Sequence, residues 1–173
     1  MKLTFAPRGI LQIDDARIIW PNFEGREGRY NRAGEREFTL VITGGEVCER
    51  GSDSYRVVDA QEMAEILMND VNKYGVGWNV KIKPPREDGD VFIHMKVKVK
   101  FNDRGPTIRL ETGNNVNYLD AESVKCLDYI DIVCSDMDIR PYDDLVNEDK
   151  PFRAAYLQSL RVVQEVDRFR TEE

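Results

Sequence analysis

The stretch VFIHMKVKVKF, residues 91–101, decides the fold that we expect for this chain. Apolar and polar side chains alternate along it with a period of two, the pattern of a β-strand with one buried and one exposed face. The buried face would carry Val91, Ile93, Met95, Val97, Val99 and Phe101. The exposed face would carry Phe92, His94, Lys96, Lys98 and Lys100. The segment is therefore predicted to be a strand whose outer face begins with an aromatic ring and continues as a row of cations.

The preceding segment, residues 79–83, repeats this arrangement. Its inward residues are expected to be Val80 and Ile82, and its outward residues Lys81 and Lys83. Two prolines end the segment and an Asp-Gly-Asp sequence at 88–90 opens the next strand, so the two strands are expected to form a hairpin. Asp-Gly is chiefly a turn signal, and no metal site is predicted there.

The rest of the pattern predicts further short strands and one main helix. Strands are expected at 16–20, 37–42, 107–111, 129–133 and 155–163, although a helix competes for the last segment. A helix is expected at 60–74, with Asp59 as its N-cap and Gly75 as its stop, and a shorter one at 121–127. The chain should thus be mainly β with one or two helices, typical of a small OB-like β-barrel, while other α+β folds stay open.

Length and composition limit the classes of protein to consider. A chain of 173 residues, 41% hydrophobic and 33% charged, fits one globular domain over residues 1–173. No segment resembles a membrane span or a signal peptide, so we expect a cytoplasmic protein. The three cysteines have neither the number nor the spacing of a disulfide framework or a zinc site. No cofactor is predicted.

The net charge of −7 is unevenly distributed. Residues 1–110 carry 18 basic against 17 acidic residues, whereas residues 111–173 carry 7 against 15. An acidic segment at 136–149, with six acids against Arg140 alone, accounts for much of this difference, and a short tail at 167–173 ends the chain. The acidic segment is interpreted as a solvated loop, as a competitor of nucleic acid for the basic face, or as a contact for a partner protein.

Two parts of the chain suggest a polyanionic ligand. Within residues 81–110, eight Lys and Arg stand against four Asp and Glu. The loop at 23–36 adds arginines and rings, of which Arg26, Arg29, Tyr30, Arg32 and Arg36 are the candidates for contact. Cations that follow phosphates and rings that stack on unpaired bases are the usual components of single-strand binding. The alternative is that both parts are solvent-exposed surface without a binding role.

Other candidate residues give weaker signals. His94 has no nucleophile motif beside it, so it is expected to assist phosphate contact or to have no role, and an enzyme is not predicted. Trp20 and Trp78 occupy the same alternating positions as the core residues of their strands. We therefore expect both to be core residues, and regard a role as platforms for bases as the second interpretation.

The chain resembles the phage and prophage single-stranded DNA-binding protein family. The segment DARIIWPNFEGR at 15–26, the continuation through residues 29–38, and NVKIKPPR at 79–86 carry the resemblance, which covers most of residues 13–133. It implies an OB-fold, non-catalytic and largely sequence-independent coating of single-stranded DNA in phage replication or recombination, and location in the host cytoplasm. It also implies that replication or recombination proteins are potential partners.

Two segments depart from that family pattern. Residues 44–58 look like an insertion before the helix, and the chain end at 169–173 is a poor match to an acidic, aromatic-ended tail. The alternative function is a protein-interaction module, such as a phage inhibitor of a host enzyme or a structural component, acting through the acidic C-terminal third. The sequence leaves the oligomeric state open, a dimer included.

Overall fold

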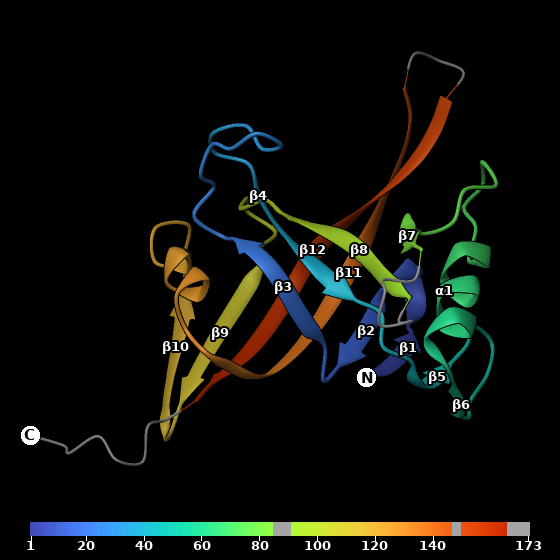
Figure 1. Cartoon of the computed structure of the whole chain (residues 1–173), viewed down its shortest axis with the longest axis horizontal. Helices are drawn as coiled ribbons and strands as arrows, with labels where there is room; N and C mark the ends of the chain where they lie inside the picture. The colour runs from blue at the N-terminus through green and yellow to red at the C-terminus, as the bar shows by residue number, and fades with distance from the viewer. Residues whose placement is uncertain (85–90, 147–149, 166–173) are drawn as a thin grey trace, which may run out of the picture.

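The computed structural model describes residues 1–84, 91–146 and 150–165, and in this part of the chain β-strands predominate (Figure 1). The strands are β1 (Lys2–Phe5), β2 (Leu11–Asp14), β3 (Arg17–Asn22), β4 (Arg36–Val41), β5 (Gly45–Cys48), β6 (Arg56–Val58), β7 (Val80–Lys83), β8 (Phe92–Val99), β9 (Thr107–Thr112), β10 (Asn115–Leu119), β11 (Ile132–Val146) and β12 (Lys150–Gln164). The helices are α1 (Ala60–Asn69) and the short 3-10 helices η1 (Pro7–Gly9) and η2 (Val124–Asp128). A mainly β chain with one α-helix is as expected.

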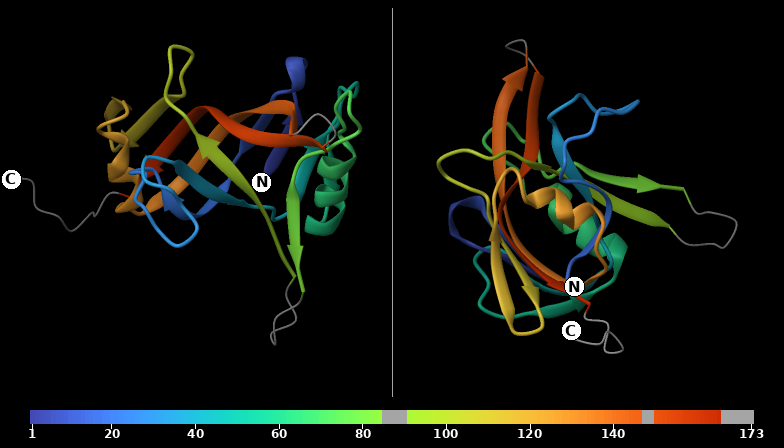
Figure 2. Two further views of the ribbon diagram at one scale, coloured as in Figure 1. Left: turned by 90° about the horizontal axis from the view of Figure 1, so that it is seen from above. Right: turned by 90° about the vertical axis from the view of Figure 1, so that its left-hand side faces the viewer.

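The strands form one sheet in the order β3-β4-β8-β12-β11-β2-β1-β5-β6, with β7 beside β8, and β9 between β10 and β12. The strands curl around a shared interior, and α1 lies at one end of it (Figures 1 and 2). The interior holds one cluster of buried apolar side chains drawn from both long strands, α1 and the amino-terminal strands. None of the helices in the described residues is long and apolar enough to cross a membrane.

The alternation predicted for residues 91–101 is confirmed in β8. Ile93, Met95, Val97 and Val99 are at most 4% exposed, whereas the lysines between and after them are exposed. Val91 is the exception at the start, because it precedes the strand and is 46% exposed. The strand is central in the sheet, with β4 along one edge and β7 and β12 along the other.

The predicted hairpin of β7 and β8 is also confirmed by their antiparallel pairing. The expectation that Ile82 faces the core is wrong, since its side chain is 45% exposed while Val80 is 8% exposed. The hairpin extends away from the body of the molecule (Figure 2), so only its base has a core to pack against. The predicted turn at 88–90 lies outside the described residues.

Helix α1 begins as predicted and ends early. The Asp59 carboxylate accepts a hydrogen bond from the Glu62 amide at 2.8 Å, which confirms the N-cap. The helix ends at Asn69 and not at residue 74. The cause lies in Asn72, whose Oδ1 accepts from the amides of Tyr74 and Val76 and so folds this segment into a turn that contains Gly75.

The acidic segment is not a loop in its described part. Residues 136–146 belong to β11, which pairs with β12 along almost its whole length, so the solvated-loop interpretation is wrong there. Met137 and Ile139 are buried, while Asp136 and Asp138 alternate with them and point to the opposite face. The strand predicted at 155–163 is confirmed within β12, but the one at 129–133 begins only at Ile132, because η2 and a turn occupy the residues before it.

Candidate nucleic-acid interface

The outer surface of β7 and β8 gathers most of the predicted basic residues on one face, called here the lysine face: Lys81, Lys83, Phe92, His94, Lys96, Lys98 and Lys100. Lys81 lies opposite His94 and Lys83 opposite Phe92 in the antiparallel pairing. Directly opposed residues of neighbouring strands point to the same side of a sheet. The two strands therefore present one continuous basic and aromatic surface.

Three rings meet at one end of the lysine face. The Trp20 ring lies 5.6 Å from that of Phe92 and 6.1 Å from that of His94, while Phe92 and His94 stack at 4.6 Å between centroids. Because β4 separates β3 from β8, the indole extends across β4 to reach them. Beneath this crossing, Thr39 and Val41 are buried although they belong to the outer face.

The expectation that Trp20 is a core residue is wrong, since it is 58% exposed. Its φ of 50° and the register shift between Ile19 and Asn22 turn its side chain out of the alternation on which that expectation rested. The expectation for Trp78 is confirmed, because its side chain is 2% exposed. The alternation of the sequence therefore did not identify Trp20 as an exposed ring.

His94 is held in its neutral form at neutral pH. Its pKa is lowered below the ordinary histidine value by burial and by the nearby charges of Lys83 and Lys81. Its Nε2 atom is buried without a hydrogen-bond partner among the described residues. The face therefore combines neutral rings with a positive charge that comes from lysine alone.

The lysines further along β8 differ in their surroundings. Lys96 Nζ lies 3.5 Å from a Glu37 carboxylate oxygen, and that acid is opposite Lys98 on β4. Lys98 and Lys100 make no ion pair among residues 1–84, 91–146 and 150–165. They line a hollow of about 330 Å³ with residues 34–37 and Tyr156. A groove thus separates the lysine row from the base of the arginine loop.

The arginine loop has a fixed base. Asn22 Oδ1 accepts from the amides of Gly25 and Arg26, and Asn31 Nδ2 lies within hydrogen-bond distance of three loop carbonyls. Tyr30 is 84% exposed, and the Arg29 guanidinium lies 5.4 Å from its ring centroid. Both views of Figure 2 show this loop extending from the same side of the molecule as the β7–β8 hairpin.

Two of the predicted arginines are engaged within the protein. Arg26 lies 3.6 Å from Glu24 and 3.9 Å from the buried carboxylate of Asp128. Arg36 donates to the Ala121 carbonyl at 2.7 Å and lies over the Phe101 ring. The structure therefore places Arg29, Tyr30 and Arg32 on the exposed part of the loop, and Arg26 and Arg36 at internal contacts near its base.

A second group of rings was not predicted from the sequence. Tyr142 on β11 lies 6.1 Å from Phe152 and 5.9 Å from Tyr156 on β12. Tyr156 pairs with Lys98, which places this group at the side of the lysine face away from β4. Alternation along β12 was a signal that these rings share one face, but only the sheet order shows that β8 is the neighbouring strand.

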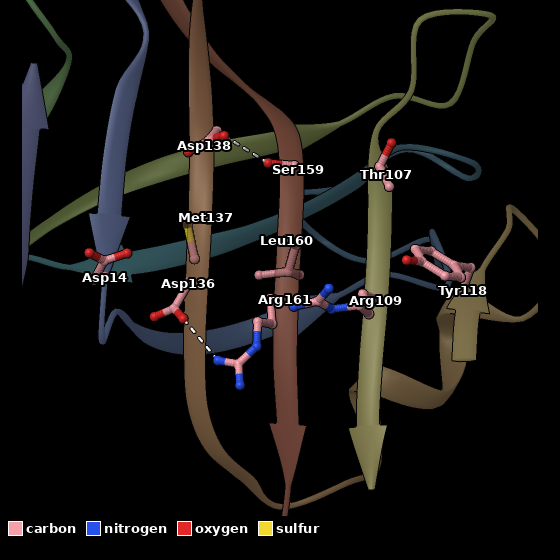
Figure 3. A pocket seen from close by; sticks show the side chains of 10 residues that line it. All are labelled: Asp14, Thr107, Arg109, Tyr118, Asp136, Met137, Asp138, Ser159, Leu160 and Arg161. Atoms are coloured by element: carbon pink, nitrogen blue, oxygen red, sulfur yellow. Dashed lines mark hydrogen bonds and ion pairs between the residues drawn. The ribbon is translucent and has the colours of Figure 1, made fainter. Parts of the chain in front are cut away.

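The acidic side chains of β11 are largely occupied by neighbours. Figure 3 shows Asp136 pointing to Arg161 and Asp138 to Ser159, at 3.0 Å each, in a hollow of about 320 Å³. Asp143 forms two hydrogen bonds with the buried guanidinium of Arg153, at 2.7 and 3.2 Å. No group of acidic, histidine or cysteine residues suited to a metal ion occurs among the described residues.

Comparisons with known proteins identify the family of this chain. The family model described as "Putative phage ssDNA-binding domain" matches residues 4–171. No curated protein sequence matches the chain.

Solved structures of the single-stranded DNA-binding protein from bacteriophage Enc34 are similar in fold. A C-terminal truncation and a complex with single-stranded DNA each share 12% identity and a TM-score of 0.50, cover 95% of this chain, and are themselves covered to 90% and 92%. A further structure of that protein shares 14% identity and a TM-score of 0.50. This match covers 98% of the present chain and 93% of the chain in that structure. Because the family model covers nearly the whole sequence, the chain belongs to the family of phage single-stranded DNA-binding domains.

Proposed function

We propose that this protein, as a member of that family, holds single-stranded DNA on the lysine face, without catalysis and largely without regard to base sequence. The observation that carries this proposal is the junction of Trp20, Phe92 and His94 with the lysines of β7 and β8 on one exposed surface. Stacking on rings binds any base, and ammonium groups bind phosphates of any sequence.

The proposed path of the strand follows the order of groups along β8. Bases stack at the Trp20 end, phosphates lie along Lys96 and Lys98, and the hollow beside Lys100 receives the next nucleotides. Arg29, Tyr30 and Arg32 on the arginine loop approach the strand from across that hollow. Arg26 and Arg36 would act by holding the base of the loop in place.

The architecture that we propose is one OB-like domain over residues 1–173, in which the curled sheet presents an outer nucleic-acid-binding face. The likeness of the Enc34 protein, one structure of which contains single-stranded DNA, supports this assignment. We further propose that the protein acts in the cytoplasm of the bacterial host, in phage DNA replication or recombination, where unpaired strands arise.

The test is a fluorescence-anisotropy titration of labelled oligo-dT over a range of salt concentrations. The intact protein should bind more weakly as salt rises, and Lys96→Glu combined with Lys98→Glu should weaken binding at least tenfold at low salt. Glu substitution of two exposed cations elsewhere, Arg56 and Lys125, changes the net charge equally and serves as control. Unchanged binding of the double lysine variant would refute the proposed surface.

The alternative of a protein-interaction module acting through the acidic C-terminal third has less support. It requires Asp143 to be available to a partner, whereas that carboxylate is bound to Arg153. Asp136 is likewise paired with Arg161. These contacts stabilise β11 and β12. Of the adjacent acids Asp143 and Asp144, Asp144 is the more exposed.

A further inference from the structure

Three arginines that the proposed path does not use line a second hollow. Arg8 of η1, Arg104 of the loop between β8 and β9, and Arg140 of β11 border a space of about 850 Å³, together with Asp103, Gln158 and Ser159. Elements far apart in the sequence thus bring three guanidinium groups and one carboxylate to one place. The balance of charge in this arginine hollow is positive.

The three guanidinium groups have not been neutralised by the protein. Elsewhere in the molecule arginines are paired with acids, as Arg153 is with Asp143 and Arg161 with Asp136. Within the described part of the chain, Arg8, Arg104 and Arg140 form no ion pair. Of the residues that the structure describes, Asp103 is the one carboxylate that lines the hollow, so it offsets only part of the repulsion between three positive charges, and an anion that enters the hollow relieves the rest.

The arginine hollow adjoins the lysine face through one ring. Tyr156 lines the hollow that contains Lys98 and Lys100, and the Arg140 guanidinium lies 5.2 Å from the Tyr156 ring centroid. Arg140 and Tyr156 are directly opposite each other on β11 and β12. A strand that leaves Lys100 therefore meets an aromatic platform and then a group of cations, the same order of groups as at the Trp20 end.

The loop that carries Arg104 packs against β12. Asn102 and Gly105 form a bridge that closes the loop carrying Arg104. A Cβ atom at Gly105 would lie 3.5 Å from the Gln158 carbonyl oxygen, so the loop lies directly against β12. Arg104 is consequently held beside Gln158 and Ser159 on the strand that carries Tyr156.

We propose that Arg8, Arg104 and Arg140 form a second phosphate-binding site, into which the DNA strand passes from the lysine face over Tyr156. This inference rests on the proposed function, since the ligand is the same strand. It extends the contact along the outer face of the sheet, from β8 across β12 to β11. It assigns to the arginine hollow the phosphates beyond those bound at Lys98 and Lys100.

The experiment compares oligo-dT of two lengths, about 6 and about 20 nucleotides, which bracket most of the range of OB-fold site sizes. The variant is Arg8→Gln combined with Arg104→Gln, both in exposed turn positions. The matched control is Arg56→Gln combined with Lys125→Gln, which removes the same charge elsewhere. Anisotropy is measured over a range of salt concentrations, and thermal unfolding verifies that both variants fold like the intact protein.

The long oligonucleotide should bind the arginine variant at least fivefold more weakly, with the slope of log affinity against log salt reduced by about 1.4, or 0.7 per lost phosphate contact. The short oligonucleotide, which fits the lysine face, should be affected no more than by the control. Equal affinity and slope for the long strand in the variant and the control would overturn the second site. Failure of the intact protein to bind either length would instead overturn the proposed function.

Discussion

The indole ring of Trp20 meets the phenyl ring of Phe92 edge to face, with 5.6 Å between the ring centroids. The two residues lie on β3 and β8, so this contact passes over β4 and joins three strands on their outer side. The exposed indole, packed against the half-buried Phe92 ring and supported from below by buried residues, is a firm surface on which a base can stack.

Replacement of Trp20 by alanine should weaken binding of oligo-dT by about 1–3 kcal/mol, the range for loss of one stacked base. Phenylalanine at the same position should restore most of the affinity. Tyr118→Ala is the control, since Tyr118 is 69% exposed on β10, away from the lysine face. Equal losses in the Trp20 and Tyr118 variants would show that Trp20 is not a stacking platform.

Tryptophan fluorescence gives an independent measurement of the same contact. Of the two tryptophans, Trp78 is buried and lies against the Arg153 guanidinium, so DNA should quench only the emission of Trp20. Trp20→Phe should therefore bind oligo-dT without the fluorescence change that the intact protein shows. Quenching of similar size in that variant would place the bound strand elsewhere.

Replacement of Glu37 by glutamine should strengthen binding. Glu37 lies 3.5 Å from Lys96 and opposite Lys98, so its charge competes with phosphate for both ammonium groups. Its removal should increase the salt dependence by up to about 0.7 in the log–log slope, one additional phosphate contact. Because the ion pair is partly exposed, thermal stability should hardly change.

Glu46→Gln, on the exposed face of β5, removes an equal charge far along the sheet and is the matched control. The titration uses oligo-dT at several salt concentrations for all three proteins. A Glu37 variant that binds no more tightly than the Glu46 variant would show that Lys96 does not reach the strand.

The elements with clear periodicity were the ones that sequence could predict. Alternation identified β8, β7 and the middle of β12, and the Asp59 cap located the start of α1. The strands missed were β1, β2, β5, β6 and β10, each of five residues or fewer, in which so few alternations do not distinguish a strand from a loop. The equally short β7 was recognised because two prolines mark its end.

In β11 the acidic residues concealed a strand. Aspartate is unfavourable in strands, yet here Asp136 and Asp138 occupy outward positions where Arg161 and Ser159 satisfy them. The local sequence contains no information on these partners, because they lie on another strand. The period of two around Met137 and Ile139 was the remaining signal, and the density of charge outweighed it.

The candidate site divides in the same way. The lysine face follows from alternation within single strands, and so it could be predicted. Trp20 could not, because a positive φ and a register shift reverse its direction. The rings of Tyr142, Phe152 and Tyr156 could not be placed beside Lys98 either, since the order of strands in a sheet depends on long-range pairing.

Binding should strengthen as pH falls through the pKa of His94. The pKa lies below the ordinary value because of burial and the charges of Lys83 and Lys81, so the imidazole is neutral at pH 7 and gains its charge only in more acidic solution. Phosphates of a bound strand favour the charged form and should raise this pKa. By linkage, affinity increases by up to about tenfold for each pKa unit of that rise.

His94 is the only histidine of the chain, so its imidazole signals in an NMR titration can be assigned without ambiguity. His94→Gln should leave binding at pH 7.5 nearly unchanged and remove the increase below about pH 6.5, the unperturbed histidine pKa. A pKa that stays constant on addition of oligo-dT would show that no phosphate approaches this ring.

Neutralising Asp143 should destabilise the folded protein rather than weaken a contact with a partner protein. Its carboxylate binds the Arg153 guanidinium, which is 7% exposed, lies over the Trp78 ring and donates to the Asp70 carbonyl at 2.7 Å. Loss of Asp143 leaves the buried guanidinium with only the more distant Asp70 carboxylate, 3.7 Å from Nη1, as counter-charge, at a cost of about 3 kcal/mol. For a chain of this length, Asp143→Asn should lower the Tm by roughly 6–12 °C.

Asp144→Asn is the matched control, because Asp144 is exposed and accepts only from the Tyr142 hydroxyl and the Leu145 amide among described contacts. Its Tm should remain within about 2 °C of the intact protein, as for most surface substitutions. Oligo-dT affinity below the Tm should be similar in both variants. If Asp143→Asn retained the full Tm, Asp143 would have no structural role. Its position in the acidic segment would then support the alternative function, in which this segment binds a partner protein.

The same contacts determine the response to acid. Burial tends to raise the pKa values of Asp70 and Asp143, but hydrogen bonds outweigh it and lower both, chiefly from Arg50 and Trp78 to Asp70 and from Arg153 to Asp143. Because these pKa values are lower in the folded than in the unfolded chain, the stabilisation is complete above the unfolded value of 3.8 and is lost as pH falls through the lower folded values. Asp143→Asn should therefore show a smaller decrease in Tm between pH 5 and about pH 2.5 than Asp144→Asn, and equal decreases in the two variants would contradict the assigned role of the Asp143–Arg153 pair.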